Sequence, residues 1–292
     1  MNTMTDTPVI DKAGAIARPI GDILVSTGRL SAQDAQRILE RQKQDHSQFG
    51  DAAIALKLLK REDIDFALSK QFDYSYLLAN DTSRSPELVA AYKPFSRIGE
   101  NLRAVRSQLM LRWFNNENAH KAVAMVSPGA GEGRSFIAAN LAIVFSQQGQ
   151  RTLLIDADLR KARQHALFGL GKSAGLSGIL ADRAGLEAAL PVQGIDNLMV
   201  LPAGAVPPNP QELLGRAAFG NLLKAAAENF DVVIVDTPAG TDFADAEIIA
   251  SATGAAVMVT RKNQTRLPDA ALLARRLQDG GVVMVGSILN DD

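Results

Sequence analysis

The sequence is poor in several residue types, and each scarcity removes a class of function. It contains no cysteine, which excludes disulfide bonds, thiol nucleophiles and thiolate metal sites. Its three histidines, His46, His120 and His165, are scattered along the chain, so we expect no zinc site. Neither sign of charge dominates, because 31 basic residues stand against 32 acidic ones, and we expect no nucleic-acid partner.

Long hydrophobic runs are missing as well. No segment approaches the roughly 18 consecutive apolar residues that a membrane-spanning helix needs. Residues 1–17 also lack the apolar stretch of a signal peptide, and we expect this N-terminus to be disordered. These absences favour a cytoplasmic protein, whose 292 residues, 47% of them apolar, suffice for one large and one small domain.

An internal repeat occupies the first part of the chain. Residues Gly21–Val25 align with Gly50–Ile54, and the same shift of 29 positions aligns apolar residues further along. Each copy predicts a short helix, a turn and a second amphipathic helix. We therefore expect a small helical repeat domain at 18–80, followed by a linker at 81–95, where polar and turn-forming residues gather.

The repeated motif, Gly-Asp-x-Leu-Val with a later Leu-x-x-Gln, resembles the N-terminal domain of type II secretion and type IV pilus assembly ATPases. Some of those domains bind cyclic di-GMP, so the resemblance implies this dinucleotide as a candidate ligand. The second copy departs from the pattern, because Lys57 replaces the equivalent Gly28, and Gln48 stands where an arginine often precedes the glycine. The alternative for this domain is a helical spacer or docking module.

The rest of the chain, predicted as one domain at 96–292, alternates apolar runs with helical patterns. After a helix at 96–114, strands are predicted at 122–126, 152–156, 198–201, 232–236, 255–260 and 282–289, and helices at 135–147, 217–229 and 267–278. Continuous Val, Ile and Leu runs separated by helices indicate an α/β fold with a mostly parallel sheet covered on both faces. Ligands of such sheets bind at the carboxyl ends of the strands.

A glycine-rich loop, Ser127-Pro-Gly-Ala-Gly-Glu-Gly-Arg-Ser135, follows the first of these strands and opens a helix. Glycines allow backbone N–H groups to surround a phosphate, and the helix N-terminus adds a positive dipole end. Arg134 supplies a cation for the β and γ phosphates, and the Ser135 hydroxyl can bind Mg²⁺. The residues expected to bind the nucleotide are Gly129, Ala130, Gly131, Glu132, Gly133, Arg134, Ser135 and Phe136.

Carboxylates end two further apolar strands. Asp156 and Asp158 close the run Leu153-Leu-Ile-Asp-Ala-Asp, where strand alternation puts both on one side, and Asp236 closes a later run. Carboxylates so near one another require a cation. One carboxylate can hold Mg²⁺ while another accepts a proton, which is the division of roles found in phosphoryl transfer. The glycine-rich loop and these aspartates together predict a P-loop NTPase.

These motifs resemble the bacterial tyrosine kinases, relatives of the MinD and ParA ATPases. Asp156, Asp158 and Arg160 match the Asp-x-Asp-x-Arg motif of the kinases, and Gly129 stands where MinD and ParA carry a signature lysine. The block at 198–214, with Pro-Ala-Gly, Pro-Pro-Asn-Pro and Glu-Leu-Leu, is similar to a segment found in the kinases. A cargo-positioning ATPase like MinD is therefore disfavoured.

The resemblance is strongest to the EpsG-type branch, the kinase component of exopolysaccharide chain-length control that acts with a separate membrane protein. It implies ATP and Mg²⁺ as cofactors, with Arg134, Asp156 and Asp158 as catalytic residues. Ser135, Asp158 and Asp236 would bind the metal. It also implies recruitment to the inner face of the membrane by the chain-length regulator.

The resemblance further implies self-association. Glu100, Arg103 and Arg106, spaced at i, i+3 and i+6, match the helix motif through which these kinases form homo-oligomers. The alternative interpretation is that these three residues simply form a charged, solvent-exposed helix face.

Two departures leave an alternative function open. An arginine replaces the usual loop lysine, and its planar, longer side chain places the charge differently. The chain also ends at Asp292 without a tyrosine cluster, so autophosphorylation would use Tyr74, Tyr76 or Tyr92, unless the substrate lies on a partner. The alternative is a catalytically weak, ATP-dependent oligomerisation switch of the same export machinery.

Overall fold

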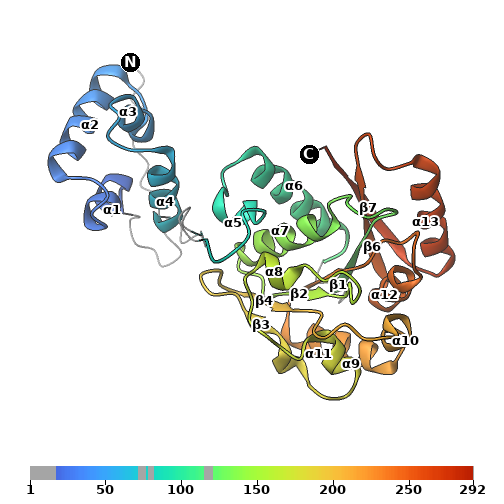
Figure 1. Cartoon of the computed structure of the whole chain (residues 1–292). Helices are drawn as coiled ribbons and strands as arrows, with labels where there is room; N and C mark the ends of the chain where they lie inside the picture. Colours follow the sequence, from blue (N-terminus) through green and yellow to red (C-terminus); the bar gives the residue numbers. More distant parts are fainter. Residues whose placement is uncertain (1–17, 72–76, 78–81, 115–120, 292) are drawn as a thin grey trace. The chain divides into compact units, whose positions relative to one another are not determined.

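The computed structural model describes residues 18–71, 77, 82–114 and 121–291 in two compact units, which divide between residues 80 and 81 (Figure 1). The segment at 1–17, predicted to be disordered, lies outside the described residues, as do Tyr74 and Tyr76. Among the helices of the described ranges, none combines the length and the hydrophobicity that a bilayer span requires.

The first unit consists of four helices that follow the predicted repeat. They are α1 (Ile20–Ser26), α2 (Ala32–Asp45), α3 (Phe49–Ala55) and α4 (Arg61–Gln71), so α1 and α3, and likewise α2 and α4, begin 29 residues apart. The turn inside each copy places one residue in the left-handed region, Gly28 with φ of 71° and Lys57 with φ of 54°. Leu24, Ile38 and their neighbours form a core of their own.

The second unit contains a seven-stranded sheet with the order β3-β4-β2-β5-β1-β6-β7. The strands are β1 (Ala122–Val126), β2 (Thr152–Asp156), β3 (Leu190–Pro191), β4 (Leu198–Leu201), β5 (Val232–Asp236), β6 (Ala255–Arg261) and β7 (Val283–Asn290). All neighbouring strands are parallel except the short β3, which runs antiparallel to β4. The predicted mostly parallel sheet is confirmed, and β3 is an addition at its edge.

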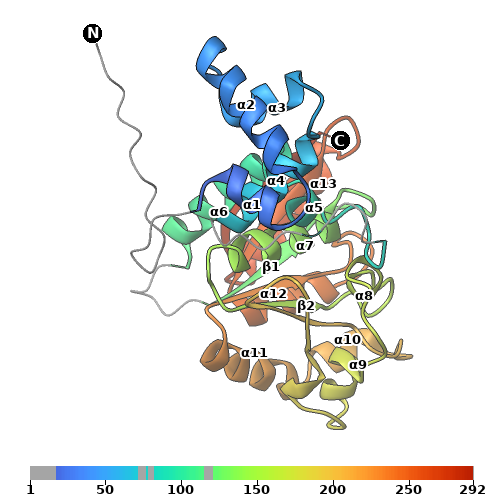
Figure 2. The same ribbon diagram turned by 90° about the vertical axis from the view of Figure 1, so that its left-hand side faces the viewer.

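Helices cover both faces of this sheet (Figures 1 and 2). On one face lie α7 (Arg134–Ser146), the helix that follows the glycine-rich loop, and α6 (Arg97–Arg112), which packs against it. Side chains of α9, α11, α12 and α13 join one buried cluster on the other face. The bounds of the remaining helices are α5 (Val89–Tyr92), α8 (Gln164–Leu167), α9 (Gly175–Leu180), α10 (Pro210–Leu214), α11 (Ala217–Asn229), α12 (Asp245–Thr253) and α13 (Leu267–Asp279).

The segment predicted as a linker at 81–95 differs from that expectation from residue 82 onward. It packs on the sheet domain, where the buried Asn140 side chain of α7 accepts a hydrogen bond from the Ala90 N–H and donates one to the Glu87 carbonyl. The Ser85 N–H donates to the carbonyl of Leu167 in α8. Main-chain groups of the predicted linker therefore fix this segment against α7 and α8.

Candidate nucleotide-binding site

The glycine-rich loop connects β1 to α7 in the conformation that its glycines permit. Gly131 and Gly133 have φ angles of 76° and 93°, in the left-handed region that other residues avoid. A side chain at Gly133 would also collide with the amide of Asn290. Helix α7 begins at Arg134, one residue before the predicted start, so its first N–H groups face the end of the loop.

Side chains at the ends of β6 and β7, and in the turn after β6, donate hydrogen bonds to the carbonyls of this loop. The carbonyls of residues 130–132 accept hydrogen bonds, in chain order, from Gln264 (3.3 Å), Arg261 (3.0 Å) and Asn290 (3.3 Å). In a planar peptide unit the C=O and the following N–H point in opposite directions. Holding three successive carbonyls therefore directs the N–H groups of residues 131–133 away from these side chains.

Glu132 stabilises the loop from within. Its side chain is buried, and its two oxygens accept hydrogen bonds from the Gly129 N–H (2.9 Å) and the Thr265 hydroxyl (2.5 Å). The carboxylate therefore serves the structure of the loop. Only the backbone N–H of Glu132, and not its side chain, is therefore expected to contact a phosphate.

The carboxylates predicted at the strand ends are brought together by the sheet. Strands β2 and β5 are neighbours, and their last residues, Asp156 and Asp236, are paired in register. Both are fully buried, and Asp158 follows two residues after Asp156, in the loop that β2 enters. The parallel arrangement thus brings the three aspartates to the same edge of the sheet.

Asp156 and Asp236 each use one oxygen for the protein and leave the other without a hydrogen bond. Oδ2 of Asp156 accepts from the N–H groups of Arg163 (3.0 Å) and Gln164 (2.9 Å), and Oδ2 of Asp236 accepts from Gln164 Nε2 (2.8 Å). Among the described residues, neither Oδ1 atom has a hydrogen-bond partner. Burial, followed by the charge of Asp236, raises the pKa of Asp156 to about 8, and burial also raises the pKa of Asp236.

Asp158 is held by its own loop. Its Oδ1 accepts hydrogen bonds from the N–H groups of Arg160 (3.1 Å) and Lys161 (2.8 Å). The Arg160 side chain turns away and forms an ion pair with the buried Asp245 at the start of α12, 2.7 Å from Nε to Oδ2. The arginine of the Asp-x-Asp-x-Arg motif therefore anchors the loop, and the sequence alone did not indicate Asp245 as its partner.

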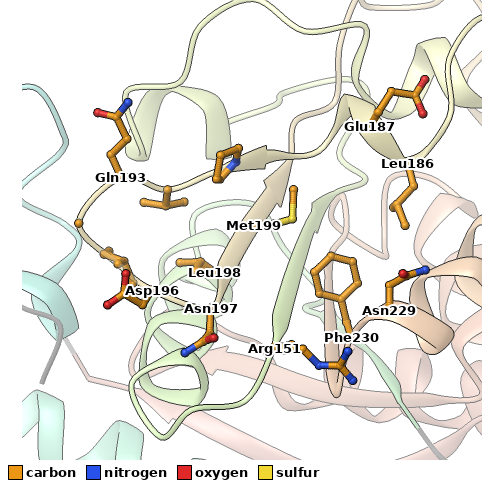
Figure 3. Close-up of a pocket in the computed structure, with 14 residues that line it drawn as sticks. Arg151, Leu186, Glu187, Gln193, Asp196, Asn197, Leu198, Met199, Asn229 and Phe230 are labelled. Atoms are coloured by element: carbon orange, nitrogen blue, oxygen red, sulfur yellow. The ribbon is translucent and has the colours of Figure 1, made fainter. Parts of the chain in front are cut away.

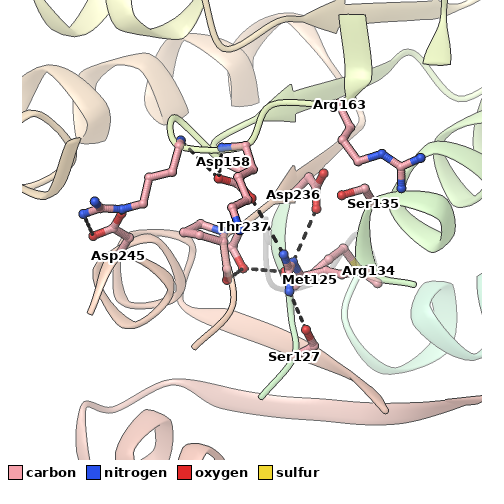
Figure 4. Close-up of polar contacts among 12 residues, drawn as sticks. Met125, Ser127, Arg134, Ser135, Asp158, Arg163, Asp236, Thr237 and Asp245 are labelled. Atoms are coloured by element: carbon pink, nitrogen blue, oxygen red, sulfur yellow. Dashed lines mark hydrogen bonds and ion pairs between the residues drawn. The ribbon is translucent and has the colours of Figure 1, made fainter. Parts of the chain in front are cut away.

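Arg134 lies among the carboxylates, with 8% of its side chain exposed (Figure 4). Its Nε is 3.7 Å from Oδ1 of Asp236, its Nη2 is 3.8 Å from Oδ2 of Asp158, and its Nη1 donates a hydrogen bond to Ser127. Both carboxylate distances are too long for hydrogen bonds but retain an electrostatic attraction. In this conformation the loop cation neutralises two of the predicted metal ligands.

The donor set fits a magnesium ion that is shared with a nucleotide. Within the described ranges, no group of three or more acidic or histidine side chains forms a ready metal cage. Mg²⁺ is usually bound by one or two carboxylates together with substrate phosphates and water. Oδ1 of Asp236, buried and without a hydrogen bond, and the half-buried Ser135 are ligands of the right type for that arrangement.

A cavity of about 150 Å³ lies beside the glycine-rich loop. Its lining consists of loop residues 130–135 together with Asp158, Arg160, Lys161, Arg163, Pro238, Ala239, Asp242 and Phe243. The remaining two predicted nucleotide-binding residues, Gly129 and Phe136, do not line it. A second cavity, about 740 Å³ in volume, lies at the opposite, amino-terminal ends of β2, β4 and β5, and none of the predicted site residues line it (Figure 3).

Sequence reasoning missed several residues that shape the site. Side chains that contact the loop or the aspartates belong to Ser127, Gln164, Arg261, Gln264, Thr265 and Asn290. Only Ser127 lies within a recognised motif, as the first residue of the glycine-rich loop. The others come from distant segments, and the folded sheet is what brings them near.

The fold and this site define the class of protein. Residues 118–290 match the ParA family described as NUBPL iron-transfer P-loop NTPase. The structure resembles the septum site-determining protein MinD from Pyrococcus horikoshii in complex with Mg-ADP, with a TM-score of 0.52 and 26% identity over 58% of this chain and 69% of that one. The predicted P-loop NTPase fold of the MinD and ParA type is thus confirmed.

Two similar sequences and a further solved structure are named as tyrosine kinases of bacteria. The chain is 36% identical to the tyrosine-protein kinase YwqD of Bacillus subtilis (strain 168), over 70% of this chain and 85% of that protein. It is 30% identical to the putative tyrosine-protein kinase CapB of Staphylococcus aureus, over 73% of this chain and 92% of that one. The kinase domain of the Escherichia coli tyrosine kinase ETK matches with a TM-score of 0.67 and 32% identity, over 72% and 81%.

The chain belongs to the bacterial tyrosine kinases, a family with the ParA-like P-loop NTPase fold. Membership implies a nucleotide and a divalent metal as cofactors.

Proposed function

We propose that this protein transfers the γ-phosphoryl group of ATP to a tyrosine hydroxyl with the help of Mg²⁺. The observation that carries the proposal lies at the carboxyl ends of β2 and β5, where Asp156 pairs with Asp236 and the guanidinium of Arg134, from the glycine-rich loop, approaches Asp236 and Asp158. The curated relatives that carry the name tyrosine-protein kinase support tyrosine as the acceptor.

The loop would bind the ATP phosphates through backbone N–H groups of residues 131–135, helped by the positive end of α7. Ser135, Asp158 and Asp236 would hold Mg²⁺, which supplies neutralisation of charge on the phosphate oxygens. Arg134 would then turn from the carboxylates toward the transferring phosphoryl group. Phosphoryl transfer depends mainly on such positioning and charge neutralisation.

Asp156 would accept the proton of the tyrosine hydroxyl. Its Oδ1 makes no hydrogen bond to the described residues, while Oδ2 is fixed by two backbone N–H groups. A carboxylate held in this way can receive a proton without losing its place. The tyrosine oxygen then bonds to phosphorus, and ADP leaves.

We further propose that the kinase acts in exopolysaccharide chain-length control, at the cytoplasmic side of the membrane, with a membrane-embedded chain-length regulator. Self-association would use Glu100, Arg103 and Arg106 of α6. Glu100 and Arg103 form an ion pair of 2.6 Å, with the Glu100 side chain 68% exposed, and Arg106 donates a hydrogen bond to the Val144 carbonyl. Of the three residues, Glu100 is the one most accessible to a second copy.

The first unit remains a candidate site for cyclic di-GMP. The two helix pairs of equal spacing and the paired left-handed turns at Gly28 and Lys57 support the resemblance that suggested this ligand. Isothermal titration of the full chain with the dinucleotide tests it. Heat saturating at micromolar concentration supports the proposal, and no heat at high micromolar concentration removes it.

The kinase proposal is tested by incubating the full chain with radiolabelled ATP and Mg²⁺, with and without the cytoplasmic segment of the membrane regulator. We expect labelled phosphotyrosine, on this chain or on the partner. Asp156→Asn should abolish the label. Nucleotide-dependent assembly without any phosphotyrosine would instead favour the oligomerisation switch.

A further inference from the structure

Gln164, the first residue of α8, contacts all three parts of the proposed nucleotide site, although no sequence motif singles it out. Its Nε2 donates hydrogen bonds to the main-chain oxygen of Ser135 (3.1 Å) and to Oδ2 of Asp236 (2.8 Å). Its backbone N–H donates to Oδ2 of Asp156 (2.9 Å). This fully buried residue therefore joins the first turn of α7 to the aspartates that end β2 and β5.

These contacts determine which oxygen each aspartate can offer to a ligand. Gln164 takes Oδ2 of both Asp156 and Asp236, whereas the two Oδ1 atoms form no hydrogen bond with the described part of the chain. A primary amide has two hydrogens, and Gln164 uses both. Its side chain is thus fixed at two points, and it fixes the Asp236 carboxylate with its Oδ1 turned to Arg134.

We propose that Gln164 is a positioning residue, which orients Asp236 and the first turn of α7 for the magnesium ion of a bound nucleotide. The proposal rests on the magnesium and nucleotide site put forward above, and it does not depend on tyrosine as the acceptor. Residues that donate hydrogen bonds to metal ligands typically raise metal affinity or activity about 10- to 100-fold. Gln164 acts on Ser135 through the main chain and on Asp236 through the carboxylate.

The experiment measures binding of a fluorescent ADP analogue to the full chain while Mg²⁺ is titrated. Gln164→Leu removes both side-chain donors at similar size, and we expect the Mg²⁺ concentration at half-maximal binding to rise about 10-fold or more. Gln147→Leu is the matched control. Gln147 follows the last residue of α7, at the end away from the site, and its side-chain amide donates a hydrogen bond to the Ala90 carbonyl. Removing this bond should leave the magnesium midpoint unchanged.

Gln164→Met, an unbranched apolar side chain of similar length, also removes both side-chain donors, so it decides the question if the leucine variant does not fold. We expect it to shift the magnesium midpoint in the same direction. An unchanged midpoint in the folded Gln164 variants, or an equal shift in Gln147→Leu, would overturn the proposal. Wild-type protein that binds the nucleotide with normal magnesium dependence but forms no phosphotyrosine would instead count against tyrosine kinase activity, and not against the role of Gln164.

Discussion

Arg134 shows at the scale of one residue how the replacement of lysine changes the site. Its guanidinium reaches Ser127, Asp158 and Asp236 together, which the single ammonium of a lysine cannot do with the same geometry. The arginine therefore neutralises the predicted metal ligands in this conformation, and its planar group presents several donors to a phosphate.

From this geometry we expect Arg134→Met to lower the rate of phosphotyrosine formation by about 10²- to 10³-fold, the usual effect of removing a donor from developing charge. Arg134→Lys, the control, retains the charge and should lose less. Steady-state rates at saturating ATP and Mg²⁺ measure both variants. Equal losses in the two would show that the charge at residue 134 is not what matters.

Asp156 gives a prediction for the dependence of stability on pH. Its pKa rises from 3.8 to about 8 in the folded protein, chiefly through burial, so the folded state holds a proton that the unfolded state releases. The free energy of unfolding should therefore fall as pH rises from about 4 to about 8. Asp156→Asn has no proton to lose at this position.

In nucleotide-free protein with a chelator present, the melting temperature of the wild type should drop more between pH 5 and pH 8 than that of Asp156→Asn. Thermal denaturation followed by circular dichroism measures this difference. Parallel curves for the two proteins would mean that folding does not raise the pKa of Asp156.

At the scale of elements, the glycine-rich loop depends on the segments around the ends of β6 and β7. Arg261, Gln264 and Asn290 donate hydrogen bonds to three successive loop carbonyls and so orient the N–H groups that would meet phosphate. A single hydrogen bond contributes about 1 kcal/mol, which corresponds to about five-fold in affinity. The loop is therefore preorganised by distant residues rather than by its glycines alone.

We accordingly expect Arg261→Ala and Asn290→Ala each to raise the Kd for Mg-ADP about five-fold. Arg275→Ala, at an exposed position of α13, is the matched control and should have no effect. Isothermal titration with Mg-ADP provides the measurement. Unchanged affinity in both loop-contacting variants would show that the loop keeps its conformation unaided.

The elements that the sequence predicts correctly are those with strong local signals. Strands β1, β2 and β5 are continuous apolar runs that end in a glycine-rich loop or an aspartate, and the sequence alone locates their bounds. Helix α8 is only four residues long and is held by Asp156, a contact across the fold that no local pattern contains. Likewise, residues 82–95 have the composition of a linker, but tertiary hydrogen bonds such as those of Asn140 override it.

At the scale of the whole molecule, the nucleotide site lies entirely within the second unit. Each residue that lines the proposed cavity follows residue 81, and the family match begins at residue 118. The first unit has its own buried core, centred on residues such as Leu24 and Ile38. The two units can therefore carry separate functions.

A chain that lacks residues 1–80 should consequently bind Mg-ADP with the Kd of the full protein, within about two-fold. The second unit supplies every contact described for the loop and the aspartates. Titration of both proteins under identical conditions gives the comparison. A loss of ten-fold or more would mean that the first unit contributes to the nucleotide site.

The most direct test is the fate of the γ-phosphoryl group in a single turnover. The full chain, with the cytoplasmic segment of its membrane regulator, is mixed with a limiting amount of ATP and with Mg²⁺. Mass spectrometry of the protein and chromatography of the phosphates then measure the products. We predict phosphotyrosine in amounts that match the ADP formed, and none with Asp156→Asn; ADP and inorganic phosphate without phosphotyrosine would contradict the assignment of this site to tyrosine phosphorylation.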